Sequence, residues 1–193
     1  MLRFAAPEDV SAMLAIYAPY VLHTTATFEY APPEEGEFLR RFRAVTAQFP
    51  WLVWEEDGVI LGYAYASTPY TREAYAWCAE PTVYLRPEAR GRGIAKALYD
   101  ALEEILRRQG YCVLYALVCD ENENSLRFHE KQGYRPAAHF PRCGFKFGRW
   151  IGLYWMEKRL DSVESPSAKP IPWCEVMQNA EIFPDILDTL SLS

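Results

Sequence analysis

A turn between a predicted strand and a predicted helix constrains this chain more than any other segment. The strand is an apolar run at Thr82–Leu85, and the helical pattern continues to about Gln109. The turn and the first residues of the helix are Arg90, Gly91, Arg92, Gly93, Ile94, Ala95 and Lys96. The first backbone N–H groups of a helix have no partner within it, and the helix dipole adds positive charge there. The segment therefore predicts an anion site that binds a phosphate or a pyrophosphate.

This turn differs from the common nucleotide-binding turns. It lacks the Gly-Lys-Ser/Thr ending of a P-loop and does not read G-x-G-x-x-G, so a nucleoside triphosphate or a dinucleotide is not the first expectation. Gly91 and Gly93 let a ligand approach the backbone without a Cβ atom in the way. Taken alone, the segment also fits a basic surface turn before an ordinary helix, so the rest of the chain has to distinguish the two.

Charge and cysteine spacing exclude several classes of protein. The 193 residues carry a formal net charge of −6, whereas nucleic-acid-binding proteins usually present a basic face. The five cysteines have neither zinc-ligand nor redox spacing, so no metal site is expected. No apolar run is long enough to span a membrane, and the N-terminus lacks a signal-peptide pattern. We therefore expect a cytoplasmic protein with one domain at 1–160 and a C-terminal linker and tail at 161–193.

Hydrophobic periodicity gives the expected order of elements. It predicts helices at 7–22, 34–49, 94–109 and 125–132. It predicts strands at 2–4, 51–55, 59–67, 82–85, 111–119 and 154–159, with another beginning at Tyr134. Glu56-Asp57-Gly58 predicts a hairpin between the second and third strands. In the tail, 184–190 is either a short docked helix or part of a disordered segment.

A second motif lies downstream of the turn and resembles a known family. It reads Asn122-x-x-Ser125-x-x-x-His129-Glu130-x-x-Gly133-Tyr134. Together with Arg90-x-x-Gly93-x-Ala95 and the order of elements, it resembles the GCN5-related N-acetyltransferases, the GNAT superfamily, over residues 2–160. The resemblance implies an α/β fold in which a mixed, splayed β-sheet is flanked by helices on both faces.

The resemblance also implies acetyl-CoA as the acetyl donor. The turn at 90–96 would hold its pyrophosphate, and the strand residues Val83, Tyr84 and Leu85 would lie along the pantetheine arm, with backbone groups of Val83 and Leu85 pairing with its amides. In the family the asparagine side chain hydrogen-bonds this arm, which is the role implied for Asn122. Alternatively, Asn122 caps the helix that follows it.

Four further segments give a narrower resemblance. They are Thr25–Glu29, Pro50–Val53, Glu80–Leu85 and Gly144–Trp150. Together they resemble the phosphinothricin and methionine sulfoximine/sulfone acetyltransferases. This implies acetylation of the α-amine of a small amino-acid-like substrate by direct attack, in a protein that is a homodimer.

An ammonium group must lose a proton before it can attack a thioester, and a nearby carboxylate can accept that proton. By resemblance, Glu80 is this base and Glu29 lies at the substrate pocket, where it assists Glu80 or binds the ammonium. His129 occupies the position from which many GNAT enzymes donate a proton to the leaving thiolate. The alternatives are a solvated turn residue for Glu80, a surface residue for Glu29, and a structural histidine for His129.

The expected substrate pocket includes four further residues. Phe28 forms a wall, Arg72 clamps a substrate carboxylate, and Lys146 and Trp150 close the far side. Phe28 and Trp150 also fit the core, and Arg72 also fits a solvated loop. The chain departs from the resemblance at Gly152, where relatives often have aspartate.

Two other functions remain open on the sequence alone. One is a GNAT enzyme that acetylates another small amine or a protein N-terminus. The other is a non-catalytic CoA-binding sensor, which would keep the turn at 90–95 without needing Glu80. The aromatic residues Phe28, Tyr70, Tyr75 and Trp77 favour a closed pocket over an open groove for a protein substrate.

Overall fold

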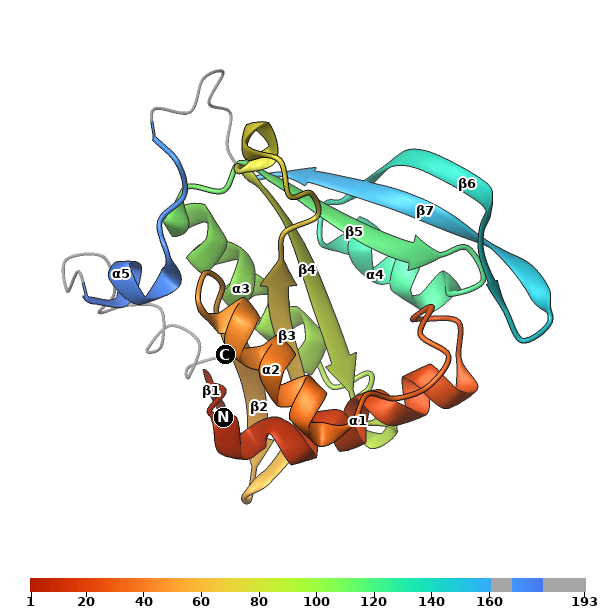
Figure 1. The fold of residues 1–193 in the computed structure, drawn as a ribbon, viewed down its shortest axis with the longest axis horizontal. Helices are drawn as coiled ribbons and strands as arrows, with labels where there is room; N and C mark the ends of the chain where they lie inside the picture. The colour runs from red at the N-terminus through yellow and green to blue at the C-terminus, as the bar shows by residue number, and fades with distance from the viewer. Residues whose placement is uncertain (161–167, 179–193) are drawn as a thin grey trace.

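The computed structural model describes residues 1–160 and 168–178, and within them a seven-stranded sheet has the order β1-β2-β3-β4-β5-β7-β6 (Figure 1). The strands are β1 (Leu2–Phe4), β2 (Trp51–Glu56), β3 (Val59–Ser67), β4 (Cys78–Leu85), β5 (Val113–Cys119), β6 (Arg135–Lys146) and β7 (Arg149–Arg159). The α-helices are α1 (Val10–His23), α2 (Glu35–Thr46), α3 (Ile94–Gln109), α4 (Glu123–Lys131) and α5 (Trp173–Gln178). Short 3₁₀ turns are η1 (Pro7–Asp9), η2 (Glu73–Tyr75) and η3 (Pro87–Ala89).

The sheet divides into two parts at β4 and β5. These two strands are parallel and pair only at Cys78 with Val113 and at Ala79 with Leu114. Every other neighbouring pair of strands is antiparallel. Beyond the two paired positions β4 and β5 diverge, as Figure 1 shows. The mixed, splayed sheet predicted from the sequence is therefore confirmed.

Helices cover both faces of the sheet. Helices α1 and α2 pack on one face of β2, β3 and β4, and α3 packs on the other (Figure 1). The first face buries Met13, Phe38, Phe42 and Trp51 in one hydrophobic cluster. The opposite face buries a second cluster around α3, which extends to β5 and α5. This is the layered α/β arrangement in which each sheet face is protected from water.

Helix α3 begins and ends as the sequence predicts. Its buried apolar and aromatic residues recur at helical spacing and are Ile94, Leu98, Tyr99, Ala101, Leu102, Ile105 and Leu106. Gly93 at its N-cap has φ +82° and Gly110 at its C-cap has φ +98°. Both values lie in the left-handed region, which glycine adopts without a Cβ clash.

Two strands are longer than predicted. Strand β4 begins at Cys78, ahead of the predicted Thr82, because Glu80 and Pro81 already pair with Ser67 and Ala66 of β3. Strand β7 begins at Arg149, ahead of the predicted Tyr154. Glu80 and Pro81 are not typical strand residues, so the sequence pattern did not predict the start of β4. Pairing with β3 makes this segment a strand.

Part of the tail packs on the domain. Residues 168–178 contain α5, and Val176 of this helix is fully buried in the cluster around α3. The helix considered at 184–190 lies outside the described residues. Within the described part of the chain, no helix combines the length and apolarity needed to cross a membrane.

Candidate active site

The opening between β4 and β5 forms a cavity of about 780 Å³. Its walls come from β4, β5, the loop after α1, the N-terminal end of α3, and α4. The predicted site residues that line it are Glu80, Val83, Tyr84, Leu85, Arg90, Gly91, Ala95, Asn122 and His129. The cavity therefore brings together residues from the turn, both diverging strands and the second motif.

The edge of β4 that faces the opening presents backbone groups to a ligand. Arg86 N donates to Leu61 O of β3, so alternation along the strand turns the amides of Val83 and Leu85 away from β3 and toward the opening. Pro81 has the same orientation, so its missing N–H removes no bond to β3. An extended amide-containing arm can pair with such an edge as an added strand does.

Two tyrosine hydroxyls lie within hydrogen-bond distance of backbone atoms of Leu85 and Pro81, on either side of Val83. The Tyr20 hydroxyl donates to Leu85 O at 2.6 Å and lies 3.3 Å from Leu85 N. The Tyr99 hydroxyl lies 3.1 Å from Pro81 O. The predicted pairing of a ligand at Leu85 therefore competes with Tyr20, whereas Val83 lies between the two tyrosines.

The turn before α3 is shaped to receive an anion. Gly91 has φ +73° and Gly93 has φ +82°, and a Cβ atom on either would meet nothing within 4 Å. The backbone therefore borders open space, which is what a phosphate needs to approach helix N–H groups. Arg90 lies over the Tyr20 ring at 5.4 Å and donates to its hydroxyl. These residues fit the pyrophosphate of a CoA ester.

Four residues of the predicted turn do not line the cavity. Arg92 pairs with Glu56 at 2.7 Å, and Lys96 pairs with Asp100 on its own helix. Ile94 is buried in the core, and Gly93 supplies the left-handed N-cap. Arg90 is thus the basic side chain of the turn that the structure places at the cavity.

Asn122 is both a helix cap and a cavity residue. Its side-chain oxygen accepts a hydrogen bond from Ser125 N at 3.2 Å at the start of α4. An asparagine also has two N–H donors, and these are not needed for the cap. The two interpretations of Asn122 are therefore compatible in this geometry.

Glu80 is a half-buried carboxylate immediately beyond the last paired position of β4 and β5. Burial raises the pKa of its carboxyl group. A raised pKa makes a carboxylate a stronger base, and it is a common property of groups that exchange protons with substrates. Glu80 therefore has both the position and the basicity to accept a proton inside the cavity.

His129 is neutral and acts as a hydrogen-bond acceptor toward Tyr99. Its Nδ1 lies 2.8 Å from Ser125 O, which can only accept, so Nδ1 carries the proton. Its Nε2 then accepts from the Tyr99 hydroxyl at 3.0 Å, and Pro81 O at 3.1 Å competes for the same proton. Burial lowers the pKa of His129 to about 4. This geometry does not favour the predicted role of proton donor to a thiolate.

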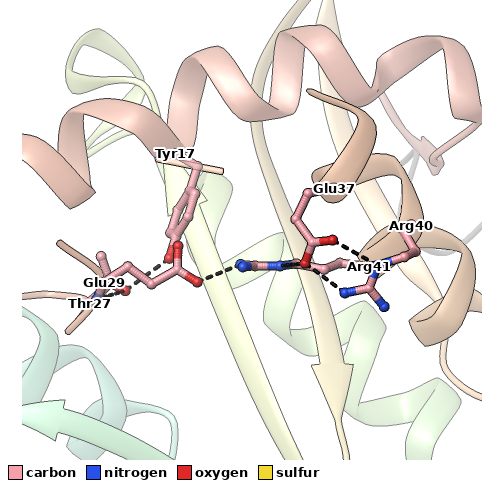
Figure 2. A network of polar contacts seen from close by, with 6 residues as sticks. All are labelled: Tyr17, Thr27, Glu29, Glu37, Arg40 and Arg41. Carbon is pink, nitrogen blue, oxygen red and sulfur yellow. Dashed lines mark hydrogen bonds and ion pairs between the residues drawn. The ribbon is translucent and has the colours of Figure 1, made fainter. Parts of the chain in front are cut away.

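Glu29 belongs to a charged network beside the cavity, which Figure 2 shows. One carboxylate oxygen pairs with Arg41 of α2, while the other is buried and has no hydrogen-bond partner among residues 1–160 and 168–178 by distance and angle. Arg41 also pairs with Glu37 at 2.9 Å. Thr27, two residues before Glu29, bonds the Tyr17 hydroxyl at 2.9 Å. A buried carboxylate oxygen without a partner is costly, and a substrate ammonium would satisfy it.

Lys146 is buried and holds the loop that carries Glu29. It is 2% exposed, and its ammonium donates to Val21 O and Thr24 O at 2.8 Å and to Thr27 O at 2.7 Å. These three bonds use every N–H of the ammonium group. Lys146 does not line the cavity, so its observed contacts differ from the predicted contact with substrate.

Four other predicted substrate residues, Glu29 among them, also lie outside the cavity lining. The Phe28 ring packs directly on Gly144, where a Cβ atom would clash with it. Arg72 is exposed on the loop before η2. Trp150 is 55% exposed and lies edge-on to Phe145. Phe28 therefore joins the loop after α1 to the end of β6, and Arg72 and Trp150 face solvent.

Comparison with known proteins identifies the family. The sequence matches the acetyltransferase (GNAT) domain over residues 2–155. The chain belongs to the GNAT acetyltransferase family. It is 39% identical over 164 residues to a phosphinothricin N-acetyltransferase of Alcaligenes faecalis, covering 83% of this chain and 82% of the relative. It is 33% identical to an L-methionine sulfoximine/L-methionine sulfone acetyltransferase of Salmonella typhimurium, covering 86% of this chain and 98% of the relative.

A solved GNAT structure has the same fold. It is a phosphinothricin acetyltransferase from Sinorhizobium meliloti in complex with acetyl-CoA, with a TM-score of 0.82 and 35% identity. The match covers 88% of this chain and 92% of that one. The protein is thus an acetyl-CoA-dependent N-acetyltransferase, and the cavity between β4 and β5 has the backbone edge and the anion turn that this co-substrate requires.

One departure from other GNAT sequences has a structural explanation. A side chain at Gly152 of β7 would collide with the carboxylate of Asp120, which follows β5. Asp120 Oδ2 lies 3.4 Å from His139 Nε2 on β6. The space beside Gly152 is therefore filled by the carboxylate of Asp120, which follows β5.

Sequence reasoning did not identify Tyr20 and Tyr99 as site residues. Both lie on helices that were correctly predicted, and both occupy positions that also fit a buried apolar face. Only their hydroxyl groups, directed at Leu85 and at Pro81 and His129, distinguish them from core residues. No spacing in the sequence signals such contacts.

Proposed function

We propose that this acetyltransferase acetylates the α-amine of a small amino-acid-like substrate of the phosphinothricin, methionine sulfoximine or methionine sulfone type. The observation that carries the proposal is Glu80, a half-buried carboxylate with a raised pKa at the narrow end of the cavity. The names of the two curated relatives support the substrate class. Acetyl-CoA supplies the acetyl group as an activated thioester.

In this proposal the residues of the chain bind, orient and deprotonate the amine. Glu80 accepts a proton from the substrate ammonium at its carboxylate, directly or through water, and the resulting neutral amine attacks without a covalent enzyme intermediate. Glu29 offers its unpartnered oxygen to the same ammonium before deprotonation. Arg72 and Trp150 complete the substrate side when the loop before η2 and the hairpin of β6 and β7 approach the bound amine.

The leaving thiolate needs a hydrogen-bond donor. Because His129 Nε2 is an acceptor in the observed geometry, His129 acts in this proposal by orienting Tyr99. Tyr99 lines the cavity, and in this proposal its hydroxyl turns from Pro81 O and His129 toward the developing negative charge. His129 is then a positioning residue for the hydroxyl rather than the proton donor itself.

We also propose a homodimer. Strand β6 is an edge strand, and its residues Arg135–Cys143 are all exposed. Large apolar side chains gather on β6, β7 and the turn between them, where Phe140, Phe145, Phe147 and Trp150 are between 45% and 55% exposed. Phe145 pairs with Trp150 and Phe140 pairs with Leu153, so these side chains lie on both faces of the β6–β7 hairpin. Exposed apolar side chains concentrated on an edge hairpin are typical of an interface between proteins.

Steady-state assays with acetyl-CoA test the function. The amine panel contains phosphinothricin, methionine sulfoximine, methionine sulfone, a polyamine and a peptide with an N-terminal alanine. We expect the three amino-acid analogues to give the highest kcat/KM. Preference for the peptide would indicate a protein N-terminal acetyltransferase, and CoA binding without turnover of any amine would indicate a sensor.

The variant Glu80→Gln tests the base. Its kcat should fall about 100-fold or more, because general-base catalysis contributes on this scale. In the wild type kcat/KM should rise with pH through the raised pKa of Glu80, since only the carboxylate form accepts a proton. The variant should lose this rise and bind CoA as before. Unchanged turnover at every pH would refute the assignment.

A further inference from the structure

The point at which β4 and β5 separate determines the geometry of the reaction site. The two strands are joined by only two residue pairs, Cys78 with Val113 and Ala79 with Leu114. Glu80 is the next residue along β4. Any change in the angle between the strands at this junction therefore moves Glu80 relative to the opposite wall of the cavity.

Trp77 anchors this junction from outside the sheet. Its backbone carbonyl accepts hydrogen bonds from Cys112 N at 2.9 Å and Val113 N at 3.2 Å, immediately before the first strand pair. Its indole N–H donates to Ala168 O at 2.8 Å. One residue thus connects the junction to the C-terminal segment 168–178, which we name the strap.

The strap is attached first to the end of α3. Ile171 N donates to Gln109 O at 3.0 Å, and the Gln109 side-chain amide donates to Ile171 O at 2.8 Å. Gln109 is 2% exposed and Ile171 is 39% exposed, so these bonds join a buried residue of α3 to the surface segment. Pro170 also packs against Gly110, the left-handed cap of α3. The residues that follow Ala168 are therefore fixed to the domain.

The second attachment is at α5. Trp173 stacks on Phe4 of β1 with ring centroids 4.9 Å apart, and its indole N–H donates to Thr46 O at 2.7 Å. Val176 is fully buried among residues of the cluster around α3. Burying a valine contributes about 1.5 kcal/mol or more. The strap is consequently held at both ends and can resist movement of Trp77.

We propose that the strap is a positioning segment of the active site, which acts through Trp77 to fix the separation of β4 and β5 and thereby the placement of Glu80. The inference rests on the proposed role of Glu80 as the base. The GNAT match ends at residue 155, so the strap lies outside the matched domain and adds to what the domain supplies. In this proposal, residues of the strap that are remote from the cavity affect catalysis by positioning Glu80.

Two variants of the full-length protein test the strap. Trp77→Phe removes the hydrogen bond to Ala168 and keeps an aromatic ring, and Val176→Asp detaches α5. The matched controls are Trp54→Phe, which removes an indole bond to Glu56 at 2.9 Å on β2, two strands from β4, and Glu175→Gln on the exposed side of α5. All are assayed well below their melting temperatures, with circular dichroism to verify folding.

We expect kcat to fall about tenfold in both test variants, because small misplacements of catalytic groups have effects of this size or larger. The KM for acetyl-CoA should change less than about twofold, since the anion turn is at the far end of α3 from the strap. Hydrogen exchange at the amides of Cys112 and Val113 should accelerate in both variants. The controls should match the wild type in every measurement.

Folded test variants with wild-type kcat and wild-type exchange at Cys112 and Val113 would overturn the proposal. If Val176→Asp does not fold, the kcat and exchange rates of Trp77→Phe alone test the role of the strap, because this variant leaves the packing of α5 intact. The exchange measurement needs no amine. A wild type that acetylates no amine therefore refutes the proposed function, while the exchange rates still report whether the strap fixes the junction.

Discussion

At the scale of single residues, the site depends on buried polar side chains whose partners are backbone carbonyls. Lys146 satisfies three carbonyls at the end of α1 and in the loop after it, and His129 satisfies one on α4. A cation near the C-terminal end of a helix is also favoured by the helix dipole. Both residues arrange groups that face the cavity, and neither needs to touch a substrate to matter.

The variant Lys146→Met should lower the free energy of unfolding by about 2–3 kcal/mol, because buried carbonyls lose their hydrogen-bond donor. It should also raise the KM for the amine, since the loop that carries Glu29 is released. Chemical denaturation and steady-state kinetics measure the two effects. Lys131→Met, at an exposed position of α4, is the control. A variant with wild-type stability would show that Lys146 does not hold the loop.

His129 should make the stability of the protein depend on pH. Its folded pKa of about 4 lies below the ordinary value of 6.5, so the unfolded state binds the proton first as pH falls. The free energy of unfolding should therefore decline from pH 6.5 toward pH 4, by at most about 1.4 kcal/mol per pH unit from this residue. His129→Gln should flatten this decline, and His23→Gln, at an exposed position, should not. Equal slopes in all three proteins would contradict the buried neutral state.

Residue roles were the least predictable part of the site. Glu80 and Asn122 could be placed from their motifs because each stands beside an element with a clear periodicity. Lys146 could not, because its three partners are 119 to 125 positions away in the sequence and become neighbours only in the folded chain. The same holds for Tyr20, whose partner Leu85 is 65 positions away.

At the scale of elements, α3 connects the proposed anion site to the core. Its first turn follows the glycines of that site, while its buried face packs on β2, β3 and β4. Its amphipathic pattern and flanking glycines made it predictable from the sequence. Strand β4 was predicted only in part, because Glu80 and Pro81 do not resemble strand residues. Glu80 and Pro81 pair with β3 on one side only, because β5 has already diverged on the other side. A polar residue and a proline can therefore occupy these positions of β4.

The two glycines of the anion turn should tolerate no side chain. Gly91→Ala and Gly93→Ala should each lower the free energy of unfolding by about 1 kcal/mol, because their positive φ values are unfavourable for alanine. Gly91→Ala should also weaken CoA binding, since Gly91 lines the cavity and the new Cβ atom enters the space proposed for the pyrophosphate. Unfolding curves and calorimetry measure these effects.

Gly36 of α2 provides the control for these substitutions. It has no positive φ and nothing within 4 Å of a Cβ position. Gly36→Ala should therefore raise stability by about 0.5–1 kcal/mol, as alanine does in helices. If all three substitutions changed the free energy of unfolding in the same direction, backbone conformation would not be the reason for the glycines at 91 and 93.

At the scale of the whole molecule, the sheet has a protected half and an exposed half. Strands β2 to β4 are covered by helices on both faces, whereas β6 is exposed along most of its length. The overall α/β architecture followed from the order of elements. The part of the tail that packs on the domain was not predicted, because the contacts of Trp173 with Phe4 and Thr46 join distant parts of the sequence.

The proposed dimer predicts that Phe140→Glu separates the two copies. Phe140 lies on β6 and is 45% exposed, so a charge there should disturb an interface without disturbing the core. Sedimentation velocity should show a dimer for the wild type and a monomer for the variant. Val59→Glu, at a position 46% exposed at the start of β3 and away from β6 and β7, tests whether any exposed apolar position has this effect. A monomeric wild type would refute the dimer.

The burial of Lys146 has a chemical consequence for an enzyme that works with a reactive thioester. Burial lowers the pKa of this amine, and a neutral amine is the form that an acyl donor modifies. Lys146 nevertheless offers no route of attack, because its three N–H groups point at carbonyls and only 2% of the residue reaches solvent. The fold thereby shields one of its own structural amines from accidental self-acetylation.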